Sequence, residues 1–91
     1  MNVKNRQNLR WLTGRLAAAL DVPASALNPM VPLADMGVDS VQAVSLVGEI
    51  EMHFDLDVDP TLIFDYPTLA HIAEYLTEAL AEQTVEQAEV A

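Results

Sequence analysis

The side chain best placed for chemistry in this sequence is the hydroxyl of Ser40, which follows Asp39 at the expected start of a helix. Backbone N–H groups in the first turn of a helix lack internal partners, and the helix dipole is positive there. A phosphate attached to the Ser40 oxygen would therefore be stabilised. On these residues alone, the simpler interpretation is that Asp39 or Ser40 only caps the helix.

Other catalytic and metal-binding patterns are missing from the sequence. It contains no Cys for a thiolate nucleophile, a thiolate zinc site or a disulfide. The Gly-x-Ser-x-Gly pattern of a hydrolase surrounds none of Ser25, Ser40 and Ser45. The two histidines, His53 and His71, are too far apart in sequence to indicate a metal cluster. We therefore predict no catalytic residue and no metal site.

The alternating acids at 55–59 resemble the opening of a calcium-binding loop. Counting Asp55 as the first position places Pro60 where the sharp turn of such a loop needs Gly. Tyr66 then stands where a bidentate Glu should close the coordination shell. Calcium binding is therefore not expected at this loop.

The charge of the chain indicates which partners to expect. Fourteen acidic and 4 basic residues give a formal net charge of −10, and no Lys or Arg follows Arg15. Such a surface repels nucleic acid and anionic membranes, so proteins with basic surfaces are the expected partners. The sequence shows neither a secretory signal nor an apolar run of about 20 residues that could span a bilayer. We expect a soluble cytoplasmic protein.

The length and the helical spacing of apolar residues predict one small all-α domain, monomeric in isolation. With 91 residues, 52% of them hydrophobic, the chain can build one modest core. Leucines spaced by three and four predict a first helix over 5–20, with Leu9, Leu12, Leu16 and Ala19 or Leu20 on its apolar face. Trp11 lies off that face.

A long loop over 21–39 follows, because it contains Pro23, Pro29 and Pro32. A loop of this length suggests either a function or a short helical turn within it. The residues expected to anchor it in the core are Leu27, Leu33 and Met36.

The second helix is predicted over 40–53, with its buried stripe formed by Ala43, Leu46, Val47, Ile50 and Phe54. Val41 projects nearly opposite that stripe, Gly48 lies close to Val41 in angle, and Val44 lies between the two faces. Gly48 suggests a close approach, because Gly inside a helix costs about 1 kcal/mol relative to Ala.

A short helix over 60–64, beginning at Pro60, and a last helix capped by Thr68 and ending near Glu82 complete the fold. One face of the last helix carries Leu69, Ile72, Ala73, Leu76 and Leu80. Helices with a single apolar face must bury those faces against one another. The prediction is a four-helix bundle of three main helices and one short helix, with a frayed or linker-like tail after residue 83.

The segment Gly37-Val38-Asp39-Ser40-Val41 resembles the phosphopantetheine attachment site of acyl carrier proteins. The resemblance gains specificity from Pro32-Leu33-x-Asp35-Met36-Gly37 before it and Phe64-Asp65-Tyr66-Pro67-Thr68-Leu69 after it. It implies a carrier domain over residues 6–82, flanked by an N-terminal extension (1–5) and a C-terminal tail or linker (83–91). It also implies that a magnesium-dependent phosphopantetheinyl transferase attaches 4′-phosphopantetheine from coenzyme A to Ser40.

Within this family, Phe-Asp-Tyr-Pro-Thr resembles the carriers of type I polyketide synthases. Peptidyl carriers usually have a second Gly where Val38 stands, and fatty-acid carriers usually differ at Ser45 and Gly48. A peptidyl or fatty-acid carrier remains the alternative within the family. Outside the family, the alternatives are a helical interaction module in which Ser40 is only a cap and, last, a serine hydrolase.

A carrier of this kind catalyses nothing itself and holds acyl intermediates as thioesters on its arm. The resemblance implies docking to the transferase, ketosynthase, acyltransferase and other synthase domains through basic surfaces. Glu49 and Glu51 lie off the buried stripe, so reversing either charge should weaken docking without unfolding the bundle. The residues predicted to meet partners are Asp39, Val41, Val44, Glu49 and Glu51, with Asp35 as a further candidate.

Overall fold

The computed structural model describes the backbone of residues 3–90 and the side chains of residues 3–83. Within this range the chain forms four α-helices and no strand: α1 (Val3–Leu20), α2 (Ser40–Phe54), α3 (Leu62–Asp65) and α4 (Leu69–Val90). The long loop contains two 3-10 turns, η1 (Ala24–Ala26) and η2 (Leu33–Met36). The predicted all-α bundle of three main helices and one short helix is confirmed.

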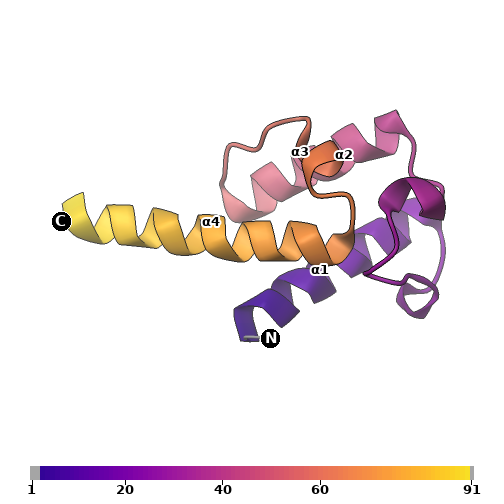
Figure 1. The fold of residues 1–91 in the computed structure, drawn as a ribbon, viewed down its shortest axis with the longest axis horizontal. Helices are drawn as coiled ribbons and strands as arrows, with labels where there is room; N and C mark the ends of the chain where they lie inside the picture. Colours follow the sequence, from indigo (N-terminus) through magenta and orange to yellow (C-terminus); the bar gives the residue numbers. More distant parts are fainter. Residues whose placement is uncertain (1–2, 91) are drawn as a thin grey trace.

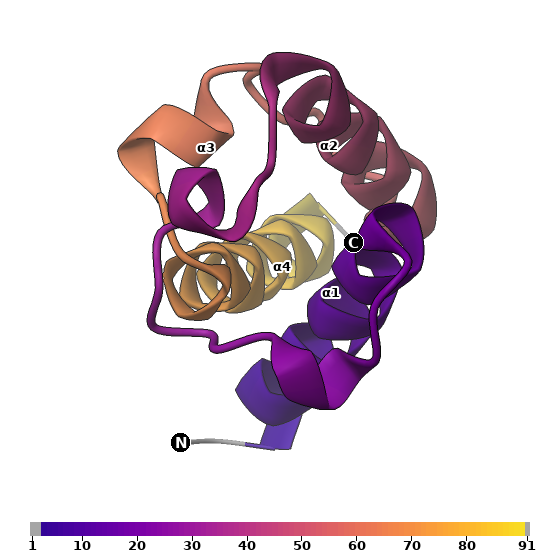
Figure 2. The ribbon, with the colours of Figure 1, turned by 90° about the vertical axis from the view of Figure 1, so that its right-hand side faces the viewer.

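The helices are arranged around one elongated core, with overall dimensions of 44 × 26 × 20 Å. In Figure 1, α1 and α4 cross each other, α2 lies above them, and the C-terminal part of α4 projects beyond the other helices. Figure 2, a view from the end of the bundle, shows the loop between α1 and α2 passing the start of α4 on its way to α2. The end of this loop leads directly into Ser40, the first residue of α2.

Apolar faces from every helix meet in a single core. Leu12, Ile50, Leu69, Ile72 and Leu76 are fully buried, each 0% exposed. Burying a side chain of this size stabilises the fold by about 1.5–3 kcal/mol relative to leaving it in water. The predicted inner stripe of α2 is confirmed, since Leu46, Val47 and Ile50 are buried while Ala43 and Phe54 are half-buried.

The predicted first helix is confirmed, with one correction at its start. It begins at Val3 and not at residue 5, and of Ala19 and Leu20 it is Leu20 that packs against the core. Asn5 and Asn8 are buried as well, and Thr77 of α4 gives both a hydrogen-bond partner: the Asn8 amide donates to Thr77 Oγ1 over 3.0 Å, and Thr77 Oγ1 donates to Asn5 Oδ1 over 3.3 Å. The apolar spacing did not reveal this polar contact, because it depends on the partner helix.

The predicted end of the last helix near Glu82 is wrong, because α4 continues to Val90. Residues 83–90 contain neither Gly nor Pro and are rich in Gln, Glu and Ala, which favour helix. Thr68 caps α4 as predicted, its Oγ1 accepting from the His71 N–H over 3.1 Å. The predicted domain limits at 6 and 82 stay predictions, and in the tail the side chains after Gln83 and residue 91 itself lie outside the described part.

The long loop is held in place as the sequence predicted. Leu33 is buried, and Leu27 and Met36 are half-buried against the core. Backbone hydrogen bonds tie the loop to the far side of the bundle: the Leu33 N–H donates to the Pro67 carbonyl over 2.8 Å, and the Ala70 N–H to the Pro29 carbonyl over 3.1 Å. The segment before Ser40 is thereby fixed to the start of α4.

The predicted short helix over 60–64 is displaced along the chain, because α3 spans Leu62–Asp65. Asp59 explains the shift. Its carboxylate accepts from the Thr61 N–H over 2.8 Å and from the Thr61 hydroxyl over 2.7 Å, and its carbonyl accepts from the Leu62 N–H. Pro60 therefore lies in a turn that precedes the helix and not at its first position.

Candidate functional site at the start of helix α2

The start of α2 is built by a capping box formed by Asp39 and Gln42. The Asp39 carboxylate accepts from the Gln42 N–H over 2.8 Å, and the Gln42 side chain accepts from the Asp39 N–H over 3.1 Å. Gly37 precedes the box with φ +91°, a left-handed conformation that suits Gly. Asp39 is thus the cap, and Ser40 is the first residue of the helix.

Ser40 itself is exposed, and within the described residues no hydrogen bond engages its hydroxyl. The Gln42 N–H is taken by the Asp39 carboxylate and the Ala43 N–H by the Asp39 carbonyl. The N–H groups of Ser40 and Val41 are therefore available to an anion at the positive end of the helix dipole. These features fit a phosphate ester on Ser40, and they contradict the alternative in which Ser40 serves only as the cap.

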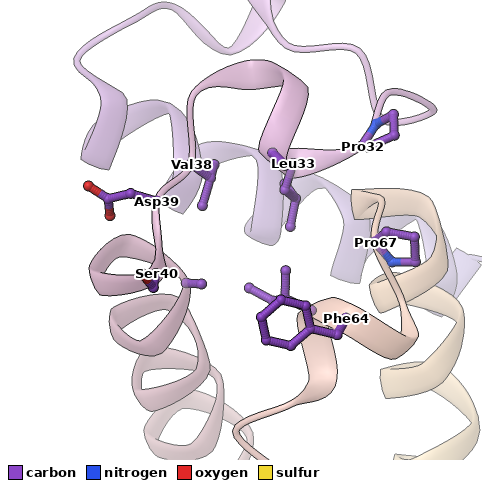
Figure 3. A pocket seen from close by; sticks show the side chains of 10 residues that line it. Pro32, Leu33, Val38, Asp39, Ser40, Phe64 and Pro67 are labelled. Atoms are coloured by element: carbon purple, nitrogen blue, oxygen red, sulfur yellow. The ribbon is translucent and has the colours of Figure 1, made fainter.

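An apolar cavity of about 340 Å³ opens beside Ser40, between the loop, α2 and α3. In Figure 3, Leu33 and Val38 from the loop and Phe64 from α3 point into this space, whereas the Asp39 carboxyl turns away from it. Pro67 closes the side next to α4. Any group carried on Ser40 would therefore start at the edge of an apolar recess.

Phe64 is a site residue that the sequence analysis did not single out. It is 81% exposed although it lines the cavity, so its ring stands at the rim on the side opposite Ser40. Its position in a very short helix could have indicated an exposed ring, because an aromatic side chain there need not face the core. The sequence analysis used Phe64 only as part of a motif.

The predicted partner-binding residues divide into two groups. Val41 and Val44 are 77% and 61% exposed, so both are free to meet a partner. The acids nearest Ser40, Asp35 and Asp39, are also exposed. These four residues are therefore exposed small apolar side chains and acids close to Ser40 in the sequence.

Glu49 and Glu51 are half-buried and engaged within the chain. Glu49 forms an ion pair with Arg15 of α1, and its carboxylate raises the pKa of the Arg15 guanidinium through a hydrogen bond and charge attraction. The Glu51 carboxylate accepts from the Val58 N–H over 3.2 Å. Both therefore differ from the free surface acids that a docking role would use most simply.

The described residues contain no group of three or more His, Asp or Glu side chains suited to holding a metal ion. In the same part of the chain, no helix combines the length and apolar character needed to cross a membrane. The start of α2 combines the exposed Ser40 hydroxyl, first-turn N–H groups available to an anion and an adjacent cavity.

Comparison with known proteins identifies the family. The model of the phosphopantetheine attachment site matches residues 10–76, which include the start of α2 and the cavity beside it. The chain belongs to this family of phosphopantetheine-binding carrier domains. Members of the family carry covalently attached 4′-phosphopantetheine. The resemblance drawn from the sequence is confirmed at the level of the family and of the helical fold.

Curated relatives of this carrier domain are much longer synthases, in each of which it matches one short segment. It is 35% identical over 71 residues to 6-methylsalicylic acid synthase of Penicillium patulum, covering 78% of this chain. It is 32% identical over 72 residues to one subunit of the phenolphthiocerol/phthiocerol polyketide synthase of Mycobacterium tuberculosis, covering 79% of this chain. In each case the match spans only 4% of the relative's length.

Solved structures of carrier proteins have the same fold. A free-standing peptidyl carrier protein of Acinetobacter baumannii superposes with a TM-score of 0.83 at 30% identity, covering 87% of this carrier domain and 99% of that chain. The HMG-ACPI domain from the CurA module of Lyngbya majuscula also gives 0.83, at 28% identity, covering 91% of this carrier domain and 84% of the other chain.

Proposed function

We propose that this carrier domain serves a polyketide synthase and that Ser40 is the serine to which its 4′-phosphopantetheine arm is attached. The observation that supports Ser40 most directly is the capping box. Because Asp39 is the cap of α2, the exposed Ser40 hydroxyl is not needed for capping and is free for modification. When bound, the arm supplies a terminal thiol that holds an acyl group as a thioester.

The protein contributes position and recognition in this proposal. The first-turn N–H groups of α2 stabilise the phosphate, and the ties of Leu33 to Pro67 and of Ala70 to Pro29 keep the attachment loop fixed. A flexible tether on a fixed attachment point raises the local concentration of its cargo at each partner active site. The chain is thus a substrate and carrier for other catalytic domains and not an enzyme itself.

The partners proposed are a phosphopantetheinyl transferase and the ketosynthase, acyltransferase and other domains of a synthase. Charge supports basic docking surfaces on these partners, since all 14 acids follow Arg15 in the sequence. Within the docking surface we assign roles to Asp39, Val41 and Val44, and also to Glu49 and Glu51, whose carboxylates a partner would share with Arg15 and the Val58 N–H. A cytoplasmic location belongs to the same proposal.

Mass spectrometry after incubation with coenzyme A and a broad-specificity transferase tests the assignment. We expect the wild type to gain the mass of one phosphopantetheine group and Ser40→Ala to gain none. Ser45→Ala, which removes another exposed hydroxyl from the same helix, should be modified as fully as the wild type. An unmodified wild type, or a modified Ser40→Ala variant, would contradict the proposal.

A peptidyl carrier is the second candidate, because one carrier of the same fold is a free-standing peptidyl carrier protein at 30% identity. The polyketide synthases among the curated relatives favour the first candidate. The acyl group recovered from the arm in the native host distinguishes the two, since a polyketide intermediate and an aminoacyl group differ in mass and in amine content.

A further inference from the structure

Three aromatic side chains join the end of α2 to the middle of α1. The rings of Trp11 and His53 are stacked, with their centroids 4.2 Å apart and an angle of 16° between their planes. The Phe54 ring is nearly perpendicular to both, with its centroid 5.1 Å from that of Trp11 and 4.7 Å from that of His53. Trp11 and Phe54 are half-buried against the core, whereas His53 is exposed. These three residues form what we call the ring cluster.

The ring cluster contains one group whose charge can change near neutral pH. A histidine imidazole gains or loses a proton between about pH 5 and 8, which the other two rings cannot do. A neutral imidazole stacks on Trp11 as a flat ring. A protonated imidazole in the same place is a cation over the face of an indole, and the ring quadrupole attracts it. Protonation of His53 therefore strengthens a contact that links α1 to α2.

The charged groups around His53 do not oppose a positive charge there. Glu49 and Arg15 line the same hollow as His53, at the seam between α2 and α1, and they are paired with each other. Glu49 lies four residues before His53 in α2, a spacing at which opposite charges attract. Arg15 repels a second cation, but Glu49 already matches its charge. His53 is in the last turn of α2, where the helix dipole favours a cation, and Asp55 adds an acid two residues later.

We propose that the ring cluster is a pH-dependent clasp between α1 and α2, in which a proton taken up by His53 from solvent tightens its stack on Trp11. In weakly acidic solution the imidazolium holds the end of α2 against α1. As the pH rises above neutral, the proton returns to solvent and the clasp weakens. The clasp depends on contacts within the chain, so this inference does not rest on the proposed carrier function.

Fluorescence tests the contact directly, because Trp11 is the only Trp of the chain. In the wild type, Trp11 emission should change between about pH 5 and 8, where an imidazole titrates. His53→Phe keeps a ring beside Trp11 but cannot take up a proton, so its emission should stay constant over this range. His71→Phe is the matched control. His71 is exposed on α4 and takes part in none of the ring contacts found among the described residues, so this variant should respond as the wild type does.

Thermal unfolding measures how strongly the clasp holds. The 14 acidic side chains also titrate as the pH falls, so the variants are compared with the wild type at each pH. The advantage of the wild type over His53→Phe in Tm should be about 2–6 °C larger at about pH 5.5 than at about pH 8. The sign follows because a contact with the charged imidazole adds stability only where the imidazole is charged. His71→Phe should show no such difference between the two pH values.

Trp11→Leu separates the stack from the other charges near His53. It keeps an apolar side chain at the seam and removes the ring face, so His53→Phe in this background should lose its pH-dependent effect on Tm. If that effect survives, Glu49 or the helix dipole causes it and the clasp is wrong. Emission that does not change with pH in the wild type, or that changes equally in His53→Phe, would also overturn the inference. These two outcomes decide even if Trp11→Leu does not fold.

Ser40→Ala keeps the clasp apart from the carrier function. This variant lacks the proposed attachment residue and retains the ring cluster, so its Trp11 emission should respond to pH as in the wild type. A response lost together with Ser40 would overturn the inference, because the clasp would then depend on the start of α2. Failure of the wild type to accept the arm would contradict the carrier function alone.

Discussion

Helix α2 has two apolar faces, and they have different environments. The inner face places Leu46, Val47 and Ile50 in the core, where each is less than 5% exposed. The outer face leaves Val41 and Met52 largely in water. Folding accounts for the first face, because burial of these side chains against α1 and α4 supplies the main favourable free energy. It does not account for the second.

The difference shows which residues a partner can read without disturbing the fold. A partner that contacts the outer face meets side chains that make no contribution to the core. Ser40 is the first residue of this helix, where the capping by Asp39 leaves its hydroxyl free. The inner face of α2 therefore anchors the helix in the core, and its outer face stays exposed to partners. This arrangement suits a carrier that several partners must recognise in turn.

The comparison predicts its largest effect at Ile50, which is 0% exposed. Ile50→Ala should lower the free energy of unfolding by about 2–5 kcal/mol, because it leaves a cavity among packed side chains. Met52→Ala, on the same helix but 88% exposed, should change it by less than about 0.5 kcal/mol. Urea unfolding followed by circular dichroism measures both. Similar losses at the two positions would contradict the division of the helix into two faces.

A smaller effect distinguishes the two glutamates at the edge of the outer face. Glu51→Ala removes the acceptor of the N–H of buried Val58 and should cost about 1–2 kcal/mol in the free energy of unfolding. Glu49→Ala removes only the exposed pair with Arg15 and should cost about 0.5 kcal/mol or less. The same unfolding measurement decides between them. Equal losses would mean that the Glu51 bond has no special role.

Glu49 and Glu51 also show which features of α2 could be predicted from the sequence. Helical spacing predicted both faces of α2, because the angle between residues depends only on the helix. It assigned Glu49 and Glu51 the same role, since both lie off the buried stripe. The Val58 N–H that distinguishes Glu51 comes from a loop residue seven positions later, and no periodic pattern reports such a contact. Reversal of the Glu51 charge therefore tests loop stability as well as docking.

The other differences have related causes. The capping box at Asp39 and Gln42 is local, so the start of α2 was predictable from the sequence. The polar contact of Asn8 with Thr77 joins residues 69 positions apart, and spacing within one helix cannot reveal it. The exposure of Phe64 depends on how the short α3 sits between the loop and α2. The resemblance of the motif around Ser40 indicated the attachment site, whereas its cavity required the tertiary structure.

The loop after α2 also has a buried and an exposed side, with Val58 buried and Asp59 exposed. The titration of Asp59 tests the exposed side. The Thr61 N–H and hydroxyl both donate to the Asp59 carboxylate and hold its pKa below the ordinary value. A pKa that is lower in the folded state stabilises the fold above the unfolded value of about 3.9. This contribution is lost as the pH falls through the folded value.

An NMR titration of the Asp59 carboxyl carbon measures the pKa directly. Thr61→Ala removes the hydroxyl donor and should move the pKa of Asp59 back toward its ordinary value, while the Thr61 N–H bond limits the change. Thr61→Ser keeps a hydroxyl and should leave the pKa low. Because Asp59 lies on the solvent side, neither substitution should alter the packing of Val58. An unchanged pKa in Thr61→Ala would show that the backbone bond alone sets the titration of this loop.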